Sequence, residues 1–200
     1  MEIVYYEKLQ QKLIPSIYEL ACMIEESIHE PVNITFGKIY ELLVRKKGIF
    51  FICYVNKEEI SFGFLSNGGY NKKHKRLMFF AVKKDYRNQS LGKNILRKVI
   101  KDKIYLDSGC MLACKAYLEK FYGELGFKVY NKVHTSKDEI TMLLSSTDCN
   151  IEKVNFGFYN DVEVREDYSK IYEGTTVYNN VLYKNIFLGL LFLILLLWIY

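Results

Sequence analysis

The sequence changes character twice within one stretch, Phe79-Phe80-Ala81-Val82-Lys83-Lys84-Asp85-Tyr86-Arg87-Asn88-Gln89-Ser90-Leu91-Gly92-Lys93. An apolar run ends at Val82, a polar segment follows, and apolar residues at helical spacing begin at Leu91. This pattern predicts a strand, a polar loop and a helix. The first turn of a helix leaves backbone N–H groups without partners and carries the positive end of the helix dipole, so the loop suits a phosphate. From these residues alone, an ordinary polar crossover is the commoner explanation.

Upstream of this stretch, the pattern predicts one strand, two helices and then three strands. Ser16 and Glu19 have the spacing of a capping box at the start of the first helix, and Pro31 follows its end. The run from Arg76 to Val82 is almost entirely apolar, which is typical of a central strand buried on both faces. The expected elements are a strand at 2–6, helices at 16–28 and 36–46, and strands at 48–55, 59–65 and 76–82.

Downstream, the pattern predicts alternating helices and strands up to residue 145. The expected elements are a helix at 91–103, a strand at 104–107, a helix at 113–125 that ends at Gly126, and strands at 127–133 and 140–144. This order is typical of an α/β domain with a mixed sheet. Periodicity weakens over residues 146–184, which we interpret as a stem or linker.

The stretch from Phe79 to Lys93 resembles the acyl-CoA signature of the GNAT acyltransferase superfamily, V-x-P-x-Y-R-G-x-G-x-G. The matching positions here are Val82, Tyr86, Arg87, Leu91 and Gly92. Three positions depart from the signature: Lys84 replaces a proline, and Asn88 and Ser90 replace glycines.

A second stretch strengthens the resemblance. Phe121-Tyr122-Gly123-Glu124-Leu125-Gly126-Phe127 is similar to the superfamily's F-Y-x-x-x-G-F element, whereas Lys115 stands where the superfamily often has an asparagine. The resemblance covers roughly residues 1–145. It implies a GNAT-like α/β fold with a mixed central β-sheet flanked by helices.

The resemblance also implies an activity, namely transfer of an acetyl group from acetyl-CoA to a primary amine of a protein or a small molecule. Tyr122 would be the catalytic residue, because a phenol near the thioester can supply a proton to the departing thiolate. No metal is implied. The residues that would bind the cofactor are Phe80, Ala81 and Val82 beside the pantetheine arm, and Arg87, Asn88, Gln89, Ser90, Leu91, Gly92 and Lys93 around the pyrophosphate.

The general base stays unassigned at this point. Glu59, Asp107 and His74 are the nearest candidates by position, and a water chain to a backbone carbonyl is a further alternative. The departures at Ser90 and Lys115, together with the missing base, leave open an inactive GNAT-like domain that binds acyl-CoA or a protein partner at a membrane.

The last part of the sequence predicts a membrane anchor. Residues 186–200 contain no charged side chain and close as LLFLILLLWIY, so we expect a transmembrane helix over residues 185–200. An anchor in this position and an N-terminus without signal-peptide character predict a domain in the cytosol. Asn88-Gln89-Ser90 also matches an N-glycosylation sequon, and a glycan there would block the predicted cofactor loop.

Charge and cysteine content exclude two other classes of protein. The net charge is +5, and the basic run Lys72 to Arg76 lacks the interleaved aromatic residues of a nucleic-acid platform. The five cysteines include no CxxC pair, which argues against a zinc site and favours a reducing compartment.

Overall fold

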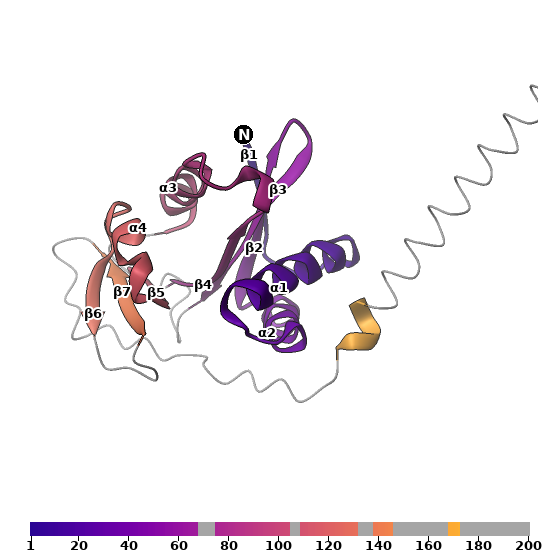
Figure 1. Cartoon of the computed structure of the whole chain (residues 1–200). Coiled ribbons are helices and arrows are strands. Elements are labelled where there is room, and N and C mark those ends of the chain that lie inside the picture. The colour runs from indigo at the N-terminus through magenta and orange to yellow at the C-terminus, as the bar shows by residue number, and fades with distance from the viewer. Residues whose placement is uncertain (68–74, 105–108, 132–137, 146–167, 173–200) are drawn as a thin grey trace, which may run out of the picture.

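The computed structural model describes residues 1–67, 75–104, 109–131, 138–145 and 168–172 of the chain (Figure 1). These residues form a seven-stranded sheet in the order β1-β2-β3-β4-β5-β7-β6, with α1 and α2 on one face and α3 and α4 on the other. The strands are β1 (Glu2–Tyr6), β2 (Gly48–Val55), β3 (Glu58–Asn67), β4 (Lys75–Val82), β5 (Cys110–Lys115), β6 (Lys128–Asn131) and β7 (Glu139–Leu144). The helices are α1 (Ile14–Ile28), α2 (Val32–Val44), α3 (Leu91–Lys103) and α4 (Glu119–Gly123).

The sheet is mixed because one strand pair runs parallel. β4 and β5 are parallel, whereas every other neighbouring pair is antiparallel. A parallel pair needs a crossover connection, and α3 supplies it. The structure confirms the predicted order of strands and helices, and it confirms the predicted bounds of β2 and α3.

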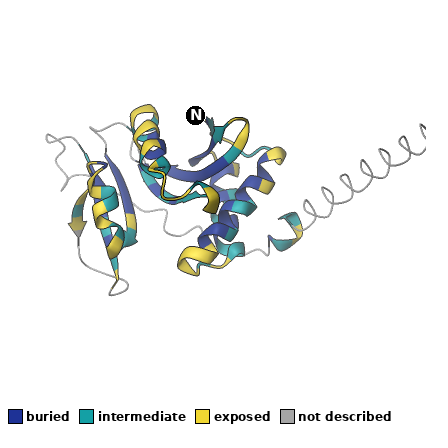
Figure 2. Ribbon diagram, turned by 45° about the horizontal axis from the view of Figure 1, so that its top comes forward, coloured by how far each residue is buried: buried dark blue, intermediate teal, exposed yellow. Residues whose placement is uncertain are grey.

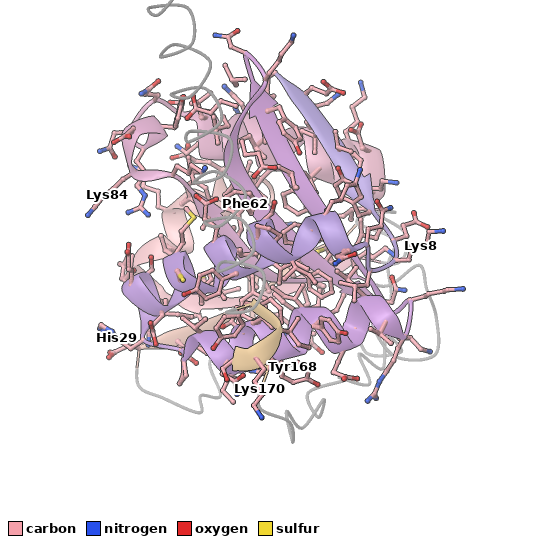
Figure 3. All side chains as sticks on the ribbon, turned by 90° about the vertical axis from the view of Figure 1, so that its right-hand side faces the viewer. Lys8, His29, Phe62, Lys84, Tyr168 and Lys170 are labelled. Carbon is pink, nitrogen blue, oxygen red and sulfur yellow. The ribbon has the colours of Figure 1, made fainter. Side chains whose placement is uncertain are left out.

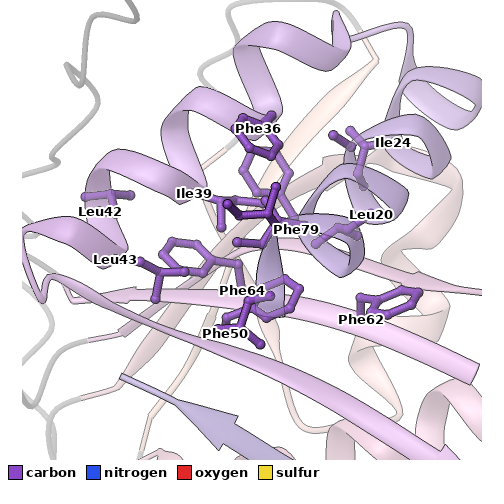
Figure 4. Close-up of a cluster of buried hydrophobic side chains, with 14 of the residues drawn as sticks. Leu20, Ile24, Phe36, Ile39, Leu42, Leu43, Phe50, Phe62, Phe64 and Phe79 are labelled. Atoms are coloured by element: carbon purple, nitrogen blue, oxygen red, sulfur yellow. The ribbon is translucent and has the colours of Figure 1, made fainter. Parts of the chain in front are cut away.

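Two hydrophobic cores lie on opposite faces of the sheet. The first fills the space between the sheet and helices α1 and α2, where Leu20, Phe36 and Phe64 are fully buried (Figure 4). The second joins the opposite face to α3 through Ile95, Leu96 and Val99. Figure 2 shows the result, with buried residues along the sheet and exposed residues on the outer sides of the helices. A sheet covered on both faces explains why its central strands read as long apolar runs.

Two local predictions are wrong. Ser16 does not cap a helix, because α1 already begins at Ile14 and the Ser16 hydroxyl donates to the carboxylate of Glu59 instead, at 3.2 Å. The predicted helix at 113–125 is wrong in its first part: residues 110–115 form β5, and only 119–123 are α-helical. The predicted strand at 104–107 lies outside the described residues except for Ile104. Ambiguity between helix and strand is expected for short apolar runs.

β4 is central, as predicted, but is not buried on both faces. Leu77 and Phe79 are buried, whereas Met78 and the residues from Phe80 to Val82 are only half-buried. These residues border a groove between β4 and β5, so the apolar run forms a groove wall as well as part of the core.

A single helical turn at residues 169–172 lies against the outer side of α1 and α2 (Figure 3). Tyr168 is almost fully buried there, its ring centroid 5.4 Å from that of Tyr40. Tyr172 stacks on Tyr18 with 4.6 Å between ring centroids. Part of the predicted stem therefore packs on the domain.

The predicted anchor at 185–200 and most of the predicted stem lie outside the described residues. Within the described ranges, no helix has the length and apolar character to span a membrane.

Candidate active site

The sheet opens between β4 and β5. The two strands pair only from Lys75 to Leu77 on β4, against Cys110 to Leu112 on β5. Beyond Leu77, β4 continues beside β3 with one extra residue, Met78, opposite the junction of Phe64 and Leu65. Such a β-bulge bends a strand and ends regular pairing. The bulge therefore lies where the two strands separate.

A groove with a volume of about 790 Å³ runs through this opening. Phe80, which packs against the α3-side core, forms part of its wall on that side. Met78, which packs against the α1 and α2 core, forms part of its wall on the other side. The groove therefore has two ends, one on each face of the sheet, and β4 separates them.

At the α3-side end, the groove meets the N-terminus of α3. The amide of Asn94 donates to the Ser90 carbonyl, at 3.2 Å, and so begins the helical hydrogen bonds. The amides of Leu91, Gly92 and Lys93 precede that bond and have no helical acceptor. All three residues line the groove. These amides point their partial positive charge toward the space where a phosphate would bind.

The loop before α3 places two residues in the left-handed backbone region. Asn88 has a φ of 62° and Ser90 a φ of 56°. The signature has glycine at both positions, and glycine adopts such angles without steric cost. Asparagine tolerates this conformation better than serine does. The two departures from the signature therefore keep the backbone shape that the glycines would give, with some strain at Ser90.

Gly92 lies close to the wall of the groove. A Cβ built on it would be 3.6 Å from Phe80, 3.6 Å from Val82 and 3.7 Å from Phe121. These are ordinary contact distances, so the glycine is not required for packing within the chain. Its lack of a side chain instead leaves room above Phe80 and Val82.

Other predicted cofactor residues have partners within the chain. Arg87 Nε donates to the Val82 carbonyl at 2.8 Å, and the Lys93 ammonium pairs with Glu124. Gln89 Nε2 donates to the Asp85 carbonyl at 3.1 Å, and its side chain does not line the groove. The structure thus brings together the remaining predicted residues Phe80, Ala81, Val82, Arg87, Asn88, Ser90, Leu91, Gly92 and Lys93.

Tyr122 lines the groove from α4, on the same side of the sheet as α3. Its ring packs edge-on against Phe121 and Phe127, with 5.0 and 5.9 Å between centroids. Burial raises the pKa of the Tyr122 hydroxyl, and the nearby Cys114 and Tyr117 raise it further. The hydroxyl therefore stays protonated at neutral pH and can donate a hydrogen bond into the groove.

Of the three base candidates from the sequence, the structure describes only Glu59, and it does not bring Glu59 to the groove. Glu59 accepts hydrogen bonds from Ser16 and Tyr54 and is not among the lining residues. Asp107 and His74 lie outside the described residues. No group of three or more metal-ligating side chains is present in the described part of the chain.

Two carboxylates that the sequence did not single out line the groove. Glu30 follows α1 and pairs with Lys38 Nζ at 2.5 Å. Glu139 begins β7 and pairs with Lys115 Nζ at 3.3 Å, because the register places it directly opposite Lys115 on β5. Correct assignment of β5 would have pointed to Glu139, but the local pattern predicts residues 113–115 as helical.

Comparison with known proteins agrees with this geometry. Residues 46–129 match the family described as acetyltransferase (GNAT) domain. No protein of curated function matches the sequence.

Solved structures share the fold at low sequence identity. An acyl-CoA N-acyltransferase from Pseudomonas aeruginosa is 15% identical with a TM-score of 0.57, over 72% of this chain and 99% of that one. The PaiA N-acetyltransferase from Thermoplasma acidophilum, in complex with coenzyme A, is 20% identical with a TM-score of 0.53, over 72% and 99%. A GNAT family acetyltransferase from Elizabethkingia anophelis with acetyl-CoA bound is 16% identical with a TM-score of 0.51, over 72% and 97%.

Proposed function

We propose that this chain is a GNAT-type, acetyl-CoA-dependent N-acetyltransferase that acetylates a primary amine entering the groove from the α1 and α2 side. The observation that carries the proposal is the two-ended groove between β4 and β5. It has phosphate-binding amides at one end and a charged mouth at the other.

The α3-side end fits acetyl-CoA. The amides of Leu91, Gly92 and Lys93 would hold the pyrophosphate, and Gly92 leaves room for it beside β4. On its β5 side, β4 has no strand partner beyond Leu77 among the described residues, so this backbone edge would pair with the pantetheine amides. Bound acetyl-CoA supplies the activated acetyl group as a thioester.

Tyr122 is the residue that we assign to the departing sulfur. In the overall reaction the new C–N bond forms, the C–S bond breaks, one proton leaves the amine and one proton ends on the sulfur. A phenol is a weaker acid than a thiol, whose ordinary pKa is about 8.5. Since the pKa of Tyr122 is raised further, its main contribution is a hydrogen bond to the developing negative charge.

Two carboxylates are available to take the proton of the amine. Glu30 and Glu139 both line the groove, and each is partly exposed beside a lysine. A carboxylate that is paired with a lysine is a weak base. A water molecule between the carboxylate and the amine would therefore carry the proton from one to the other.

We also propose that residues 185–200 anchor the chain in a membrane, with the domain on the cytosolic side. The uncharged apolar sequence of 186–200 supports the anchor. The position of Asn88 in the groove supports the orientation, because a glycan on this sequon would obstruct the cofactor end.

Calorimetric titration of the full chain with acetyl-CoA tests the cofactor site. The full chain is needed because removal of everything beyond residue 145 would take away Tyr168 from the α2 surface. We expect Gly92→Glu to abolish binding, since its carboxylate would oppose the phosphates. Gly123→Glu, with nothing within 4 Å of an added Cβ, adds the same charge and should bind normally. No binding by the folded wild type would overturn the proposal.

A further inference from the structure

Residues 168–172, which we call the docked segment, contact helix α2 near both of its ends (Figure 3). The Tyr168 amide donates to the side chain of Asn33 near the start of α2, and the Tyr168 hydroxyl donates to Glu41 near its end. Positions 33 and 41 of a helix lie about 12 Å apart along its axis, at ~1.5 Å per residue. One buried tyrosine therefore spans most of α2.

Tyr172 connects the docked segment to α1 as well as to α2. Its ring stacks on Tyr18 of α1, with 4.6 Å between centroids, and packs edge-on against Phe36 of α2 at 5.0 Å. Phe36 is fully buried in the core that α1 and α2 form with the sheet (Figure 4). Aromatic pairs at these distances stabilise by more than their buried area alone. The docked segment thus holds α1 and α2 together from their outer side.

The two helices held in this way supply part of the groove wall at the opening toward α1 and α2, which we call the acceptor end. Ile24 and Ile28 come from α1, and Lys38 comes from α2. Lys38 also pairs with Glu30 in the connection between the helices, at 2.5 Å. A shift of α1 relative to α2 would therefore change the wall of the acceptor end.

The docked segment packs on one side of the sheet. Tyr168, Ile171 and Tyr172 belong to the core of α1 and α2, whereas Leu91 at the start of α3 belongs to the core on the opposite face. Close packing transmits a displacement mainly to the elements in direct contact. The docked segment should therefore influence the acceptor end and leave the cofactor end unchanged.

We propose that Tyr168 and Tyr172 are positioning residues for the amine acceptor: they hold α1 and α2 where the acceptor end of the groove fits the amine. Neither side chain lines the groove, so both act through the helices. This inference rests on the proposed acetyl transfer. It adds a requirement for a segment that lies beyond the acetyltransferase match at residues 46–129.

Steady-state kinetics of the full chain with acetyl-CoA and benzylamine provides the test. Benzylamine is a primary amine with an apolar body, which suits a wall that contains Ile24, Ile28 and Met78. We expect Tyr172→Ala to raise KM for benzylamine by about 5-fold or more, with kcat and the Kd of acetyl-CoA changed by less than about two-fold. Tyr172→Phe keeps the stacked ring and should restore the wild-type KM.

Tyr168→Phe keeps the test valid if Tyr172→Ala fails to fold. It removes only the hydrogen bond to Glu41, and we expect it to raise KM for benzylamine by about two-fold or more. A wild-type KM in Tyr168→Phe and in any folded Tyr172→Ala would overturn the inference.

Gly63→Ala is the control for reduced stability alone. Its added Cβ would crowd Phe51, which belongs to the α3-side core, so the sheet is destabilised away from the docked segment. We expect its KM for benzylamine to remain within about two-fold of wild type. A rise equal to that of Tyr172→Ala would mean that any loss of stability has this effect, and would overturn the assignment.

Hydrogen exchange of the full chain without substrates separates this inference from the proposed function. We expect residues 24–44 to exchange about 5-fold faster or more in Tyr172→Ala, and residues 90–96 at the start of α3 to exchange as in wild type. Unchanged exchange of residues 24–44 would overturn the inference, whether or not benzylamine is acetylated. Faster exchange of these residues, in a chain whose wild type acetylates no amine, would support the positioning of α1 and α2 and contradict the transferase proposal.

Discussion

The hydroxyl of Tyr168 donates a hydrogen bond to Glu41 Oε1 at 2.6 Å, although the two residues are 127 positions apart. The Tyr168 amide also donates to Asn33 Oδ1 at 2.9 Å. Both partners lie on α2, whose Lys38 lines the groove. The segment at 168–172 thus helps to hold in place a helix that contributes to the groove wall.

We expect Tyr168→Phe to lower the free energy of unfolding by about 1–2 kcal/mol, because it removes one hydrogen bond to a carboxylate. Tyr168→Ala removes the buried ring as well and should cost about 3–5 kcal/mol. Urea denaturation of the full chain measures both values. Tyr117→Ala is the control, since this side chain is 76% exposed and its loss should change stability by less than about 0.5 kcal/mol. An unchanged midpoint in Tyr168→Ala would contradict the bracing role.

Ser90→Gly should stabilise the protein. Ser90 has a φ of 56°, which costs a side-chain-bearing residue about 1–2 kcal/mol. Glycine removes this strain but gains freedom in the unfolded chain, so we expect a net gain of about 0.5–1 kcal/mol. Asn88→Gly, at a φ of 62°, is the matched comparison and should gain less because asparagine tolerates this region. Thermal unfolding distinguishes the two, and a loss of stability in Ser90→Gly would contradict the strain.

Tyr122→Phe should reduce kcat by about 100-fold or more and leave acetyl-CoA binding unchanged. Because burial raises the pKa of Tyr122, the wild-type hydroxyl keeps its proton above the ordinary tyrosine pKa of about 10. The rate should therefore not decline between about pH 8 and 10 through loss of this proton. The test is the pH dependence of the acetyl-transfer rate, measured with acetyl-CoA and a saturating acceptor. Tyr130→Phe, exposed on β6, is the control, and full activity in Tyr122→Phe would remove the residue from the mechanism.

Cys114 should react slowly with alkylating reagents at neutral pH. Burial raises the pKa of its thiol to about 11, with Glu119 and Glu139 adding to the effect, so little thiolate exists at neutral pH. We expect the alkylation rate to rise about 10-fold per pH unit between about pH 7 and 10. Since Cys114 lines the groove, acetyl-CoA should protect it. Mass spectrometry measures the alkylation of Cys114 and of Cys22 in the same sample. Cys22 lies outside the groove lining and should show no protection by acetyl-CoA.

Gly63→Ala should destabilise the sheet. A Cβ at this position would lie 2.1 Å from Cζ of Phe51, whose ring is fully buried. Overpacking of this kind costs about 1–3 kcal/mol or more. Gly123→Ala is the matched control: nothing lies within 4 Å of the added Cβ, and alanine favours the helix by about 0.5–1 kcal/mol. In chemical denaturation, the unfolding midpoint should be lower than that of wild type for Gly63→Ala and higher for Gly123→Ala.

The sequence identified the cofactor end of the site more completely than the acceptor end. The loop before α3 is one continuous segment, so its polar residues and the start of the helix follow from local pattern alone. Glu30 and Glu139 come from separate elements, and only the sheet register and the position of the α1–α2 connection bring them to one groove. The error at 113–125 arose because Cys110 to Leu125 contains two short apolar runs that local pattern could not separate into strand and helix.

The sequence by itself determined the α/β class, the order of the strands and helices, and the strand-loop-helix that suits a phosphate. Each of these depends on hydrophobic period and on residues that are neighbours in the chain. The tertiary structure decided that β4 and β5 separate beyond Leu77, that charged residues from α2, β4, β5, β7 and the α1–α2 connection line one groove, and that Tyr168 packs on α2. These features join residues far apart in sequence, and long-range pairing and packing, rather than local preference, set their positions.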